Sequence, residues 1–372
     1  WSALLTFPLM FAIQEMCARI GLVTGHGLAG NLRRYYSRWA LLLLVGLAVV
    51  GITLNIGSAL AAMADATPIF LPLPEPILAI LYAGLIIILL IFTSYRTLAG
   101  ILKWTALTVL AYIFVPFFVQ TDCREALLHT VVPSIKLNRE TLLLFVAILG
   151  TTISPYLFFW QTAMEVEDKR SKTKRFLARW IVTKHELRDM KEDVSVGMFV
   201  SNVVMWFIIV STAVTLYANG ITNIAPAKDA AEALKPFVGQ SAHLVFTLGI
   251  VSMGILAIPV LAGSSSYALA EVMGWQEGLN KSFHQAKQFY GVIIVSTVVG
   301  LMIPFLGIDP IKALFYTGVF YGITAPILIF AILHIVNNKK LMGVHTNSPL
   351  SNFLGYLVMF IMAAAAIGAF VL

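Results

Sequence analysis

Long apolar segments separated by short polar connections make up most of the chain. A helix needs about 20 mostly apolar residues to cross the hydrocarbon core of a bilayer. Ten segments meet this length: 1–20, 39–63, 77–95, 98–120, 141–163, 194–218, 242–272, 288–308, 311–335 and 350–372. The pattern therefore predicts an all-α membrane protein with ten spanning helices.

Composition supports the same class. Hydrophobic residues make up 59% of the 372 residues and charged residues only 12%, which leaves too few polar side chains to cover a soluble protein. The net charge of +7 does not indicate nucleic-acid binding, because the basic residues lie between apolar segments, where they orient the chain in lipid. We therefore expect a lipid bilayer around the protein and no nucleic-acid partner.

Lys and Arg residues predict how the helices are oriented. If segment 1–20 ends at the cytoplasm, the connections on that side hold 19 Lys and Arg residues and the opposite connections hold 6. Because basic residues accumulate on the cytoplasmic side, this orientation is favoured for a multi-pass protein of the cell (plasma) membrane. The charged loop 165–193 is then cytoplasmic. One short amphipathic helix is expected within it, with an apolar side made by Phe176, Leu177, Trp180 and Ile181.

Sequence motifs of enzymes are absent from the chain. It has no His-Glu-x-x-His, no Walker A loop and no Gly-x-Ser-x-Gly. Its seven histidines fall at the ends of the predicted spans or in connections, where interfacial histidines are common. We therefore predict that the protein is not an enzyme and uses no cofactor.

The segment Gly150-Thr-Thr-Ile-Ser-Pro-Tyr156 lies near the middle of the fifth span. Pro155 lacks a backbone donor and clashes with the preceding turn, and Gly150 weakens the helix further. Unpaired backbone groups are not tolerated in hydrocarbon, so a broken helix has to line a cavity or lie inside protein. Many secondary transporters bind ions at such breaks. The alternative is a simple proline kink, and the flanking Gly and Thr residues favour the binding site.

This segment resembles the broken sixth helix of the Nramp metal-transporter family. A Met-Pro-His core carries the metal ligand in that helix, and Ser154, Pro155 and Tyr156 stand at its three positions. Other stretches are also similar to the family: Gly21-Leu-Val-Thr-Gly25 and Leu28-Ala29 to the loop after helix 2, Asp193 to the start of helix 7, and residues 261–274 to helix 8. In this register the first span is helix 2 and the last is helix 11.

The resemblance implies a LeuT-like inverted-repeat fold of five plus five helices followed by helix 11, with the substrate between broken helices 1 and 6. Helix 1, with its Asp-Pro-Gly break, is absent from this sequence and is expected before Trp1, where it would supply a carboxylate for a cation. The implied divisions are helices 2–5 in 1–120, an extracellular connection in 121–140, helices 6–10 in 141–335 and helix 11 in 336–372.

Several functional positions depart from the family pattern. A hydroxyl at Ser154 replaces the thioether that favours soft metals. Tyr156 and Gln161 stand at two histidine positions, and the acidic pair of helix 3 aligns with Asn55 and Ser58. These departures resemble the Nramp-related magnesium transporter branch, because hard oxygen ligands suit Mg²⁺.

We therefore expect a secondary transporter or facilitator of divalent cations that favours Mg²⁺, also carries Mn²⁺ and is not coupled to protons. The cation is the transported substrate. The expected metal ligands are Thr151, Ser154 and Tyr156, and the expected cavity-lining residues are Pro155, Gln161, Asn55, Thr317 and Tyr321. A LeuT-like carrier of a small organic solute such as an amino acid is the alternative, and a membrane scaffold or receptor comes third. The sequence leaves the oligomeric state open.

Overall fold

The fold comes from a computed structural model, which describes residues 1–68, 71–93, 100, 103, 113, 116–117, 123–133, 138–172, 180–220 and 242–371. Its described elements are helices. In chain order they are α1 Ser2–Thr24, α2 Leu28–Tyr35, α3 Arg38–Ala66, α4 Glu75–Phe92, α7 Cys123–Val131, α8 Arg139–Thr152, α9 Pro155–Lys172, α10 Lys184–Thr215, the 3₁₀ turn η1 Tyr217–Asn219, α13 Ala242–Met273, α14 Lys287–Gly300, α15 Met302–Phe305, α16 Pro310–Val336, α17 Lys339–Met342 and α18 Pro349–Val371.

Nine helical segments in the described part of the chain are long and apolar enough to cross a bilayer. They agree with nine of the ten predicted spans, and most of the tenth, 98–120, lies outside the described residues. The largest difference is at α10, which begins at Lys184 rather than at residue 194. Its start is fixed by a capping box, in which the Thr183 hydroxyl accepts the Glu186 N–H and the Glu186 carboxylate accepts the Thr183 N–H.

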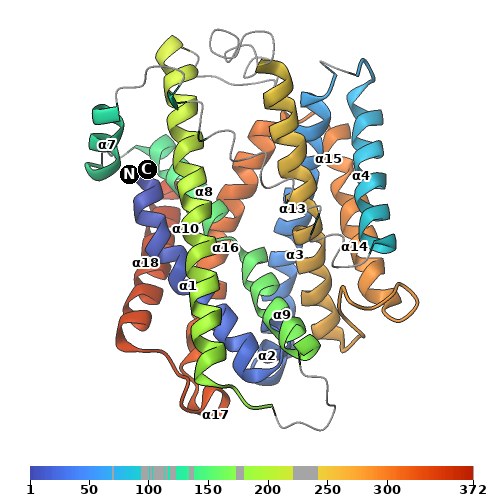
Figure 1. Ribbon diagram of the computed structural model, residues 1–372, viewed down its shortest axis with the longest axis vertical. Coiled ribbons are helices and arrows are strands. Elements are labelled where there is room, and N and C mark those ends of the chain that lie inside the picture. The colour runs from blue at the N-terminus through green and yellow to red at the C-terminus, as the bar shows by residue number, and fades with distance from the viewer. Residues whose placement is uncertain are drawn as a thin grey trace.

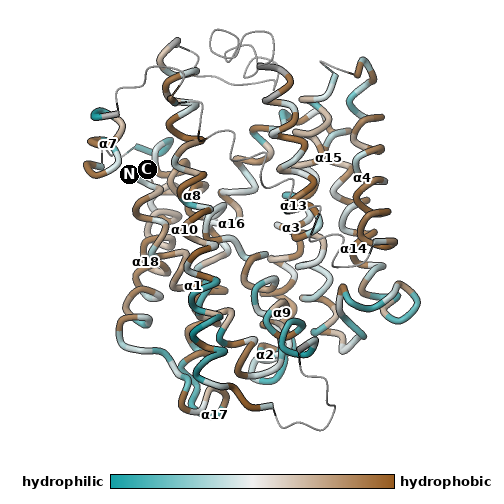
Figure 2. The backbone as a smooth tube through the Cα atoms, in the orientation of Figure 1, coloured by the Kyte–Doolittle hydropathy of each residue, from teal (hydrophilic) through white to brown (hydrophobic). Residues whose placement is uncertain are grey.

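The spanning helices stand side by side, with α1, α10 and α18 on the left of Figure 1, α4 and α14 on the right, and α16 between them. Both ends of the chain lie next to each other at the upper left, as expected for a chain whose ends share one side of the membrane. Figure 2 shows a mostly apolar α4 and a polar lower end. Ile80, Leu81 and Ile88 on α4 are each at least half exposed, which is typical of a lipid-facing helix.

Half-helix α8 and helix α16 are in direct backbone contact. A methyl group added to Gly150 would lie 2.0 Å from the carbonyl oxygen of Gly318 and 2.4 Å from the nitrogen of Gly322. Only glycine permits so close a crossing, and small residues four positions apart, as Gly318 and Gly322 are, commonly let helices approach each other in membranes. Because Gly150 also opens the predicted break, this crossing fixes the position of the break against α16.

The charged connection after α9 is more helical than the predicted loop 165–193, since α9 runs to Lys172 and α10 starts at Lys184. The expected amphipathic helix is wrong for Trp180 and Ile181, which are not helical, and Phe176 and Leu177 lie outside the described residues. Instead, the Trp180 indole N–H donates to the Leu22 carbonyl oxygen at 2.9 Å. This contact and the Lys169 ammonium, which donates to the Ile181 carbonyl at 2.7 Å, dock the segment onto α1 and α9.

Candidate functional site

The predicted break in the fifth span is confirmed. Helix α8 ends at Thr152 and α9 begins at Pro155, and Ile153 between them has φ −110° and ψ 63°, outside the helical region. The Thr151 carbonyl would normally accept a hydrogen bond from the nitrogen four residues later. That nitrogen belongs to Pro155 and carries no hydrogen, so the helix cannot continue in regular form through this point.

The Ser154 hydroxyl takes over part of the lost hydrogen bonding. Its oxygen lies 2.7 Å from the carbonyl oxygens of both Gly150 and Thr151, and the residue is fully buried. Since carbonyl oxygens accept only, the hydroxyl is the donor to this pair. Ser154 therefore caps the inner end of α8, and each carbonyl keeps a second lone pair for another partner.

Two other predicted ligands flank the break. The Thr151 side chain is exposed, and its hydroxyl donates to the Ala147 carbonyl at 2.9 Å, so its main-chain carbonyl is the group that faces the end of the helix. Tyr156 lies in the first turn of α9 and is half-buried. Its ring centroid lies 6.2 Å from that of Tyr321 on α16, an ordinary separation for an aromatic pair.

Helices α3 and α16 supply the remaining polar side chains near the break. The Tyr321 ring packs against Gly51, and the Asn55 side chain lies close to the Tyr321 hydroxyl. Toward the upper end, the Thr317 hydroxyl lies 3.4 Å from that of Ser58. The structure thus brings Tyr156, Tyr321 and Asn55 together. Thr317 lies further along the contact between α3 and α16.

Gln161 and Pro155, the other two predicted cavity-lining residues, lie in different parts of α9. The Gln161 amide donates to the Glu165 carboxylate at 3.1 Å, further down α9 and away from the Tyr156–Tyr321 pair. Pro155 is buried at the first position of α9, where its missing N–H costs nothing. Pro155 therefore shapes the break, and Gln161 belongs to a polar pair below it.

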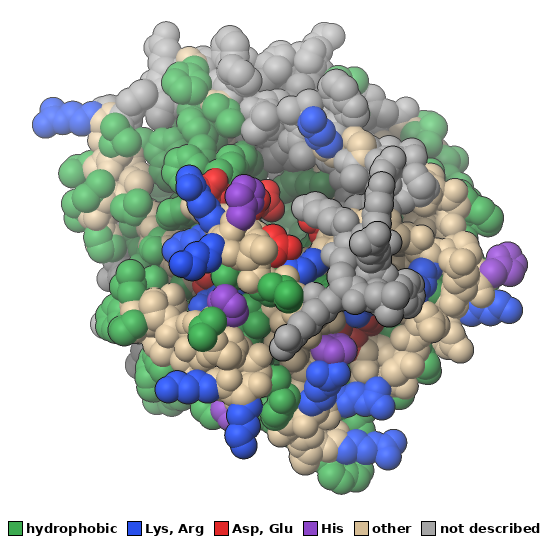
Figure 3. Space-filling view, turned by 60° about the horizontal axis from the view of Figure 1, so that its bottom comes forward, with side chains coloured by type: hydrophobic (Ala, Val, Ile, Leu, Met, Phe, Trp, Pro, Cys, Tyr) green, Lys and Arg blue, Asp and Glu red, His purple; other side chains and the backbone are tan. Residues whose placement is uncertain are grey.

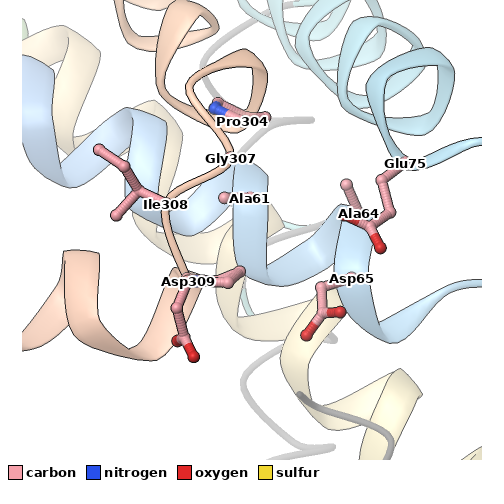
Figure 4. Close-up of a pocket in the computed structure, with 9 residues that line it drawn as sticks. Ala61, Ala64, Asp65, Glu75, Pro304, Gly307, Ile308 and Asp309 are labelled. Atoms are coloured by element: carbon pink, nitrogen blue, oxygen red, sulfur yellow. The ribbon is translucent and has the colours of Figure 1, made fainter. Parts of the chain in front are cut away.

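A cavity at the upper end was not anticipated from the sequence. It encloses about 290 Å³ between α3, α4, α15 and the start of α16, and carboxylates of Asp65, Glu75 and Asp309 line it (Figure 4). One oxygen of Asp309 also caps α16 by accepting the N–H groups of Ile311 and Lys312. The available signal was that all three acids stand at span ends on the same predicted side of the membrane.

Acidic side chains also gather near the centre of the lower face, with Lys and Arg around them (Figure 3). The Glu271 carboxylate at the end of α13 accepts the N–H groups of Gly27 at 2.5 Å and Gly30 at 3.0 Å, at the N-terminus of α2. Burial raises the pKa of the Glu277 carboxyl to about 7, although Arg170 and Lys281 favour its charged form. The two hydrogen bonds of the Glu271 carboxylate tie α2 to α13, so Glu271 has a structural role as their acceptor.

Across the described ranges, no three His, Cys, Asp or Glu side chains are grouped so that they could hold a metal ion. The break region offers neutral oxygens instead, from hydroxyls and from carbonyls at the end of a helix. Such oxygens suit hard cations that retain part of their hydration shell. The arrangement is also consistent with the negative end of the α8 dipole, which points toward the break.

Comparison with known proteins agrees with the family resemblance of the sequence. The family model for natural resistance-associated macrophage protein-like (Nramp) proteins matches residues 1–372. The divalent metal cation transporter MntH of Caldanaerobacter subterraneus subsp. tengcongensis is 29% identical over 251 residues, which cover 67% of this chain and 55% of that protein. The chain thus spans about half the length of this curated relative.

Solved structures share the fold. The Eremococcus coleocola manganese transporter, in complex with an aromatic bis-isothiourea substituted compound, superposes with a TM-score of 0.77 at 15% identity and covers 98% of this chain and 78% of its own. The inward-facing conformation of Mhp1 superposes with a TM-score of 0.57 at 10% identity, covering 98% and 81%. At these identities the likeness shows the fold alone, and the predicted LeuT-like fold is confirmed.

Proposed function

Because the chain belongs to the Nramp family, we propose that it transports divalent cations, with Mg²⁺ favoured and Mn²⁺ also carried. One observation carries the proposal: the fifth span is broken between Thr152 and Pro155, so that α8 ends there with the Gly150 and Thr151 carbonyls, to which the Ser154 hydroxyl donates. Thr151 supplies a carbonyl, Ser154 holds that end of the helix in shape, and Tyr156 lines the opposite side of the break.

The preference for Mg²⁺ follows from the chemistry of these ligands. Oxygen ligands favour hard cations, whereas a thioether favours softer transition metals. Ser154 and Tyr156 place hydroxyl groups where the family's core has sulfur and imidazole. We therefore place the chain in the Nramp-related magnesium transporter branch.

The cavity and the basic lower end together indicate how the protein is oriented in the membrane. With the Lys- and Arg-rich connections at the cytoplasm, the cavity lined by Asp65, Glu75 and Asp309 opens on the outer side. Clustered carboxylates there raise the local concentration of cations before they reach the break. The protein then acts as a multi-pass transporter of the plasma membrane.

Uptake into proteoliposomes tests the proposal. The protein produced from its complete gene is reconstituted, and Mg²⁺ and Mn²⁺ influx is followed with and without excess alanine. We expect saturable influx of both cations that alanine leaves unchanged. Influx of alanine with no cation uptake would support the organic-solute carrier instead. Liposomes without protein supply the background.

Transport is expected to proceed without proton coupling. Coupling requires a group near the ion site that changes protonation, usually histidine or a perturbed carboxylate. Here Gln161 and Asn55 do not titrate, and the phenol of a residue such as Tyr156 ordinarily loses its proton only near about pH 10. The cation would instead follow its gradient, with a negative interior adding about 2.3 kcal/mol per charge per 100 mV.

A pH-sensitive dye inside the proteoliposomes checks this expectation. Cation influx should leave the internal pH unchanged, while a negative internal potential set with K⁺ and valinomycin should accelerate it. Acidification that follows cation influx and disappears when the cation is omitted would contradict the prediction. An external pH gradient without cation serves as the control for passive leak.

A further inference from the structure

A groove lies between the lower ends of α16 and α18, away from the break in the fifth span. It encloses about 360 Å³ and is lined by Phe330, Leu333, His334, Asn337, Asn338 and Tyr356. Phe330 is 56% exposed and Tyr356 is 43% exposed, so the groove opens on the outer surface of the helices, where lipid surrounds the protein. We call this cavity the lower groove.

Apolar and polar residues lie at opposite ends of the lower groove. Phe330 is about two turns inside the end of α16 and Tyr356 about two turns inside the start of α18, which places both roughly 10 Å from the helix ends. His334, Asn337 and Asn338 line the other end, at the last turn of α16 and just beyond it. A phospholipid has the same order, with its acyl chains in the hydrocarbon core and its headgroup at the interface.

Hydrogen bonds hold the polar end of the lower groove in place. The Tyr36 hydroxyl lies 2.7 Å from the His334 Nδ1 atom, and the two rings meet edge to face. The Asn337 amide donates to the Asn352 side-chain oxygen at 2.7 Å, and the Asn352 amide donates to the Asn337 side-chain oxygen at 2.9 Å. These contacts join α16 to α18 and to the segment before α3, so the polar end is formed without a ligand.

The polar end of the lower groove is positively charged. Lys339 and Lys340 directly follow Asn338, and both are exposed. Residues 310–372, which include α16 and α18, contain no Asp or Glu, and neither do residues 16–64, which include the start of α3. Helix α1 also packs on α17 and α18, but its Glu15 is paired with Arg19 at 3.0 Å. These segments therefore offer no carboxylate to the ammonium group of a zwitterionic lipid, whereas the two lysines attract an anionic headgroup.

We propose that the lower groove binds an anionic phospholipid of the cytoplasmic leaflet, with its headgroup at Lys339, Lys340 and His334 and one acyl chain along Phe330 and Tyr356. The inference rests on the proposed orientation in the membrane and not on the identity of the transported ion. Anionic lipids are concentrated in the cytoplasmic leaflet, and basic pockets between spanning helices on that side suit their headgroups. The bound lipid contacts both α16 and α18 and therefore stabilises the folded protein.

Melting temperatures with defined lipids test the proposal. The protein produced from its complete gene is purified in a neutral detergent, and dioleoyl phosphatidylglycerol or dioleoyl phosphatidylcholine is added in increasing amounts. We expect phosphatidylglycerol to raise the melting temperature by about 4 °C and phosphatidylcholine to raise it much less. The double variant Lys339→Gln, Lys340→Gln should need about tenfold more phosphatidylglycerol for half of this rise. The double variant Lys184→Gln, Lys191→Gln is the matched control, because it removes two exposed lysines of α10 on the same side of the membrane, and it should behave as the wild type.

A second pair of variants tests the apolar end of the lower groove. Tyr356→Ala removes one of its walls and should also weaken the response to phosphatidylglycerol, whereas Phe370→Ala, at a 70% exposed side chain near the other end of α18, should not. An equal rise with phosphatidylcholine would overturn the proposed preference for anionic lipid.

An unchanged response of the Lys339→Gln, Lys340→Gln double variant would overturn the proposed position of the headgroup. Native mass spectrometry that finds a dimer without bound lipid would also overturn the proposal, in favour of a contact between two copies of the chain. Cation uptake is measured in none of these experiments, so their failure would leave the proposed function intact.

Discussion

Replacing Gly150 with alanine is expected to abolish cation uptake. The new methyl group would lie 2.0 Å from the Gly318 carbonyl oxygen and 2.4 Å from the Gly322 nitrogen, both of them main-chain atoms that cannot rotate away. Helix α8 would have to move away from α16, and the carbonyls at its end would move with it. Overpacking of this kind costs about 1–3 kcal/mol or more, so the melting temperature should also fall.

The control for this prediction is Gly46→Ala, the same change in the spanning helix α3, where an added methyl group meets nothing within 4 Å. It should leave uptake unchanged and stabilise the helix slightly, because alanine is favoured over glycine in helices by about 1 kcal/mol. Uptake is normalised to the amount of protein in the liposomes. A wild-type rate for Gly150→Ala would contradict the assignment of this crossing as a fixed support of the site.

A second large effect is expected from Ser154→Met. The substitution removes the hydroxyl that donates to the Gly150 and Thr151 carbonyls and places a thioether at the break. Soft cations gain most from sulfur. In competition with Mg²⁺ uptake, Cd²⁺ should therefore inhibit the variant at a concentration about 10 to 100 times lower than it inhibits the wild type, which corresponds to about 1.4–2.7 kcal/mol.

Ser154→Ala is the matched control, since it removes the same hydroxyl without adding sulfur. Its Cd²⁺ inhibition should stay close to that of the wild type, and its melting temperature should fall, because the Gly150 and Thr151 carbonyls lose their shared donor. If Ser154→Met and Ser154→Ala gave the same Cd²⁺ inhibition, the thioether would have no access to the ion. Selectivity would then be set by other groups around the break.

The helices and the break could be predicted from the sequence because each depends on local chemistry. A long apolar segment must form a helix in lipid, and Pro155 prevents the regular bond to Thr151 regardless of what surrounds it. The start of α10 differs from the prediction because it lies in a charged segment rather than an apolar one. Hydropathy cannot detect a helix that begins in a charged segment, although the Thr183 and Glu186 pair is a readable capping signal.

The candidate site was predictable only in part. The sequence indicates Tyr156 and Tyr321 as site residues, but their pairing depends on how α9 packs against α16, which no single segment reveals. The direction of the Ser154 hydroxyl is set by the backbone dihedral angles after Thr152, so its use as a cap could not be foreseen. The cavity lined by Asp65, Glu75 and Asp309 joins residues 61–75 with residues 304–310, two regions far apart in sequence, and only the fold brings them together.

The break has a mechanical consequence for the molecule. Its upper half, α8, packs chiefly on α16 and α18, whereas its lower half, α9, packs chiefly on α1 and α13. The two halves of one span therefore pack against different groups of helices and are joined at Ile153 and Ser154, where the regular helix is interrupted. A rotation of one of these groups of helices relative to the other would bend the chain at this joint, beside the carbonyls proposed to hold the cation.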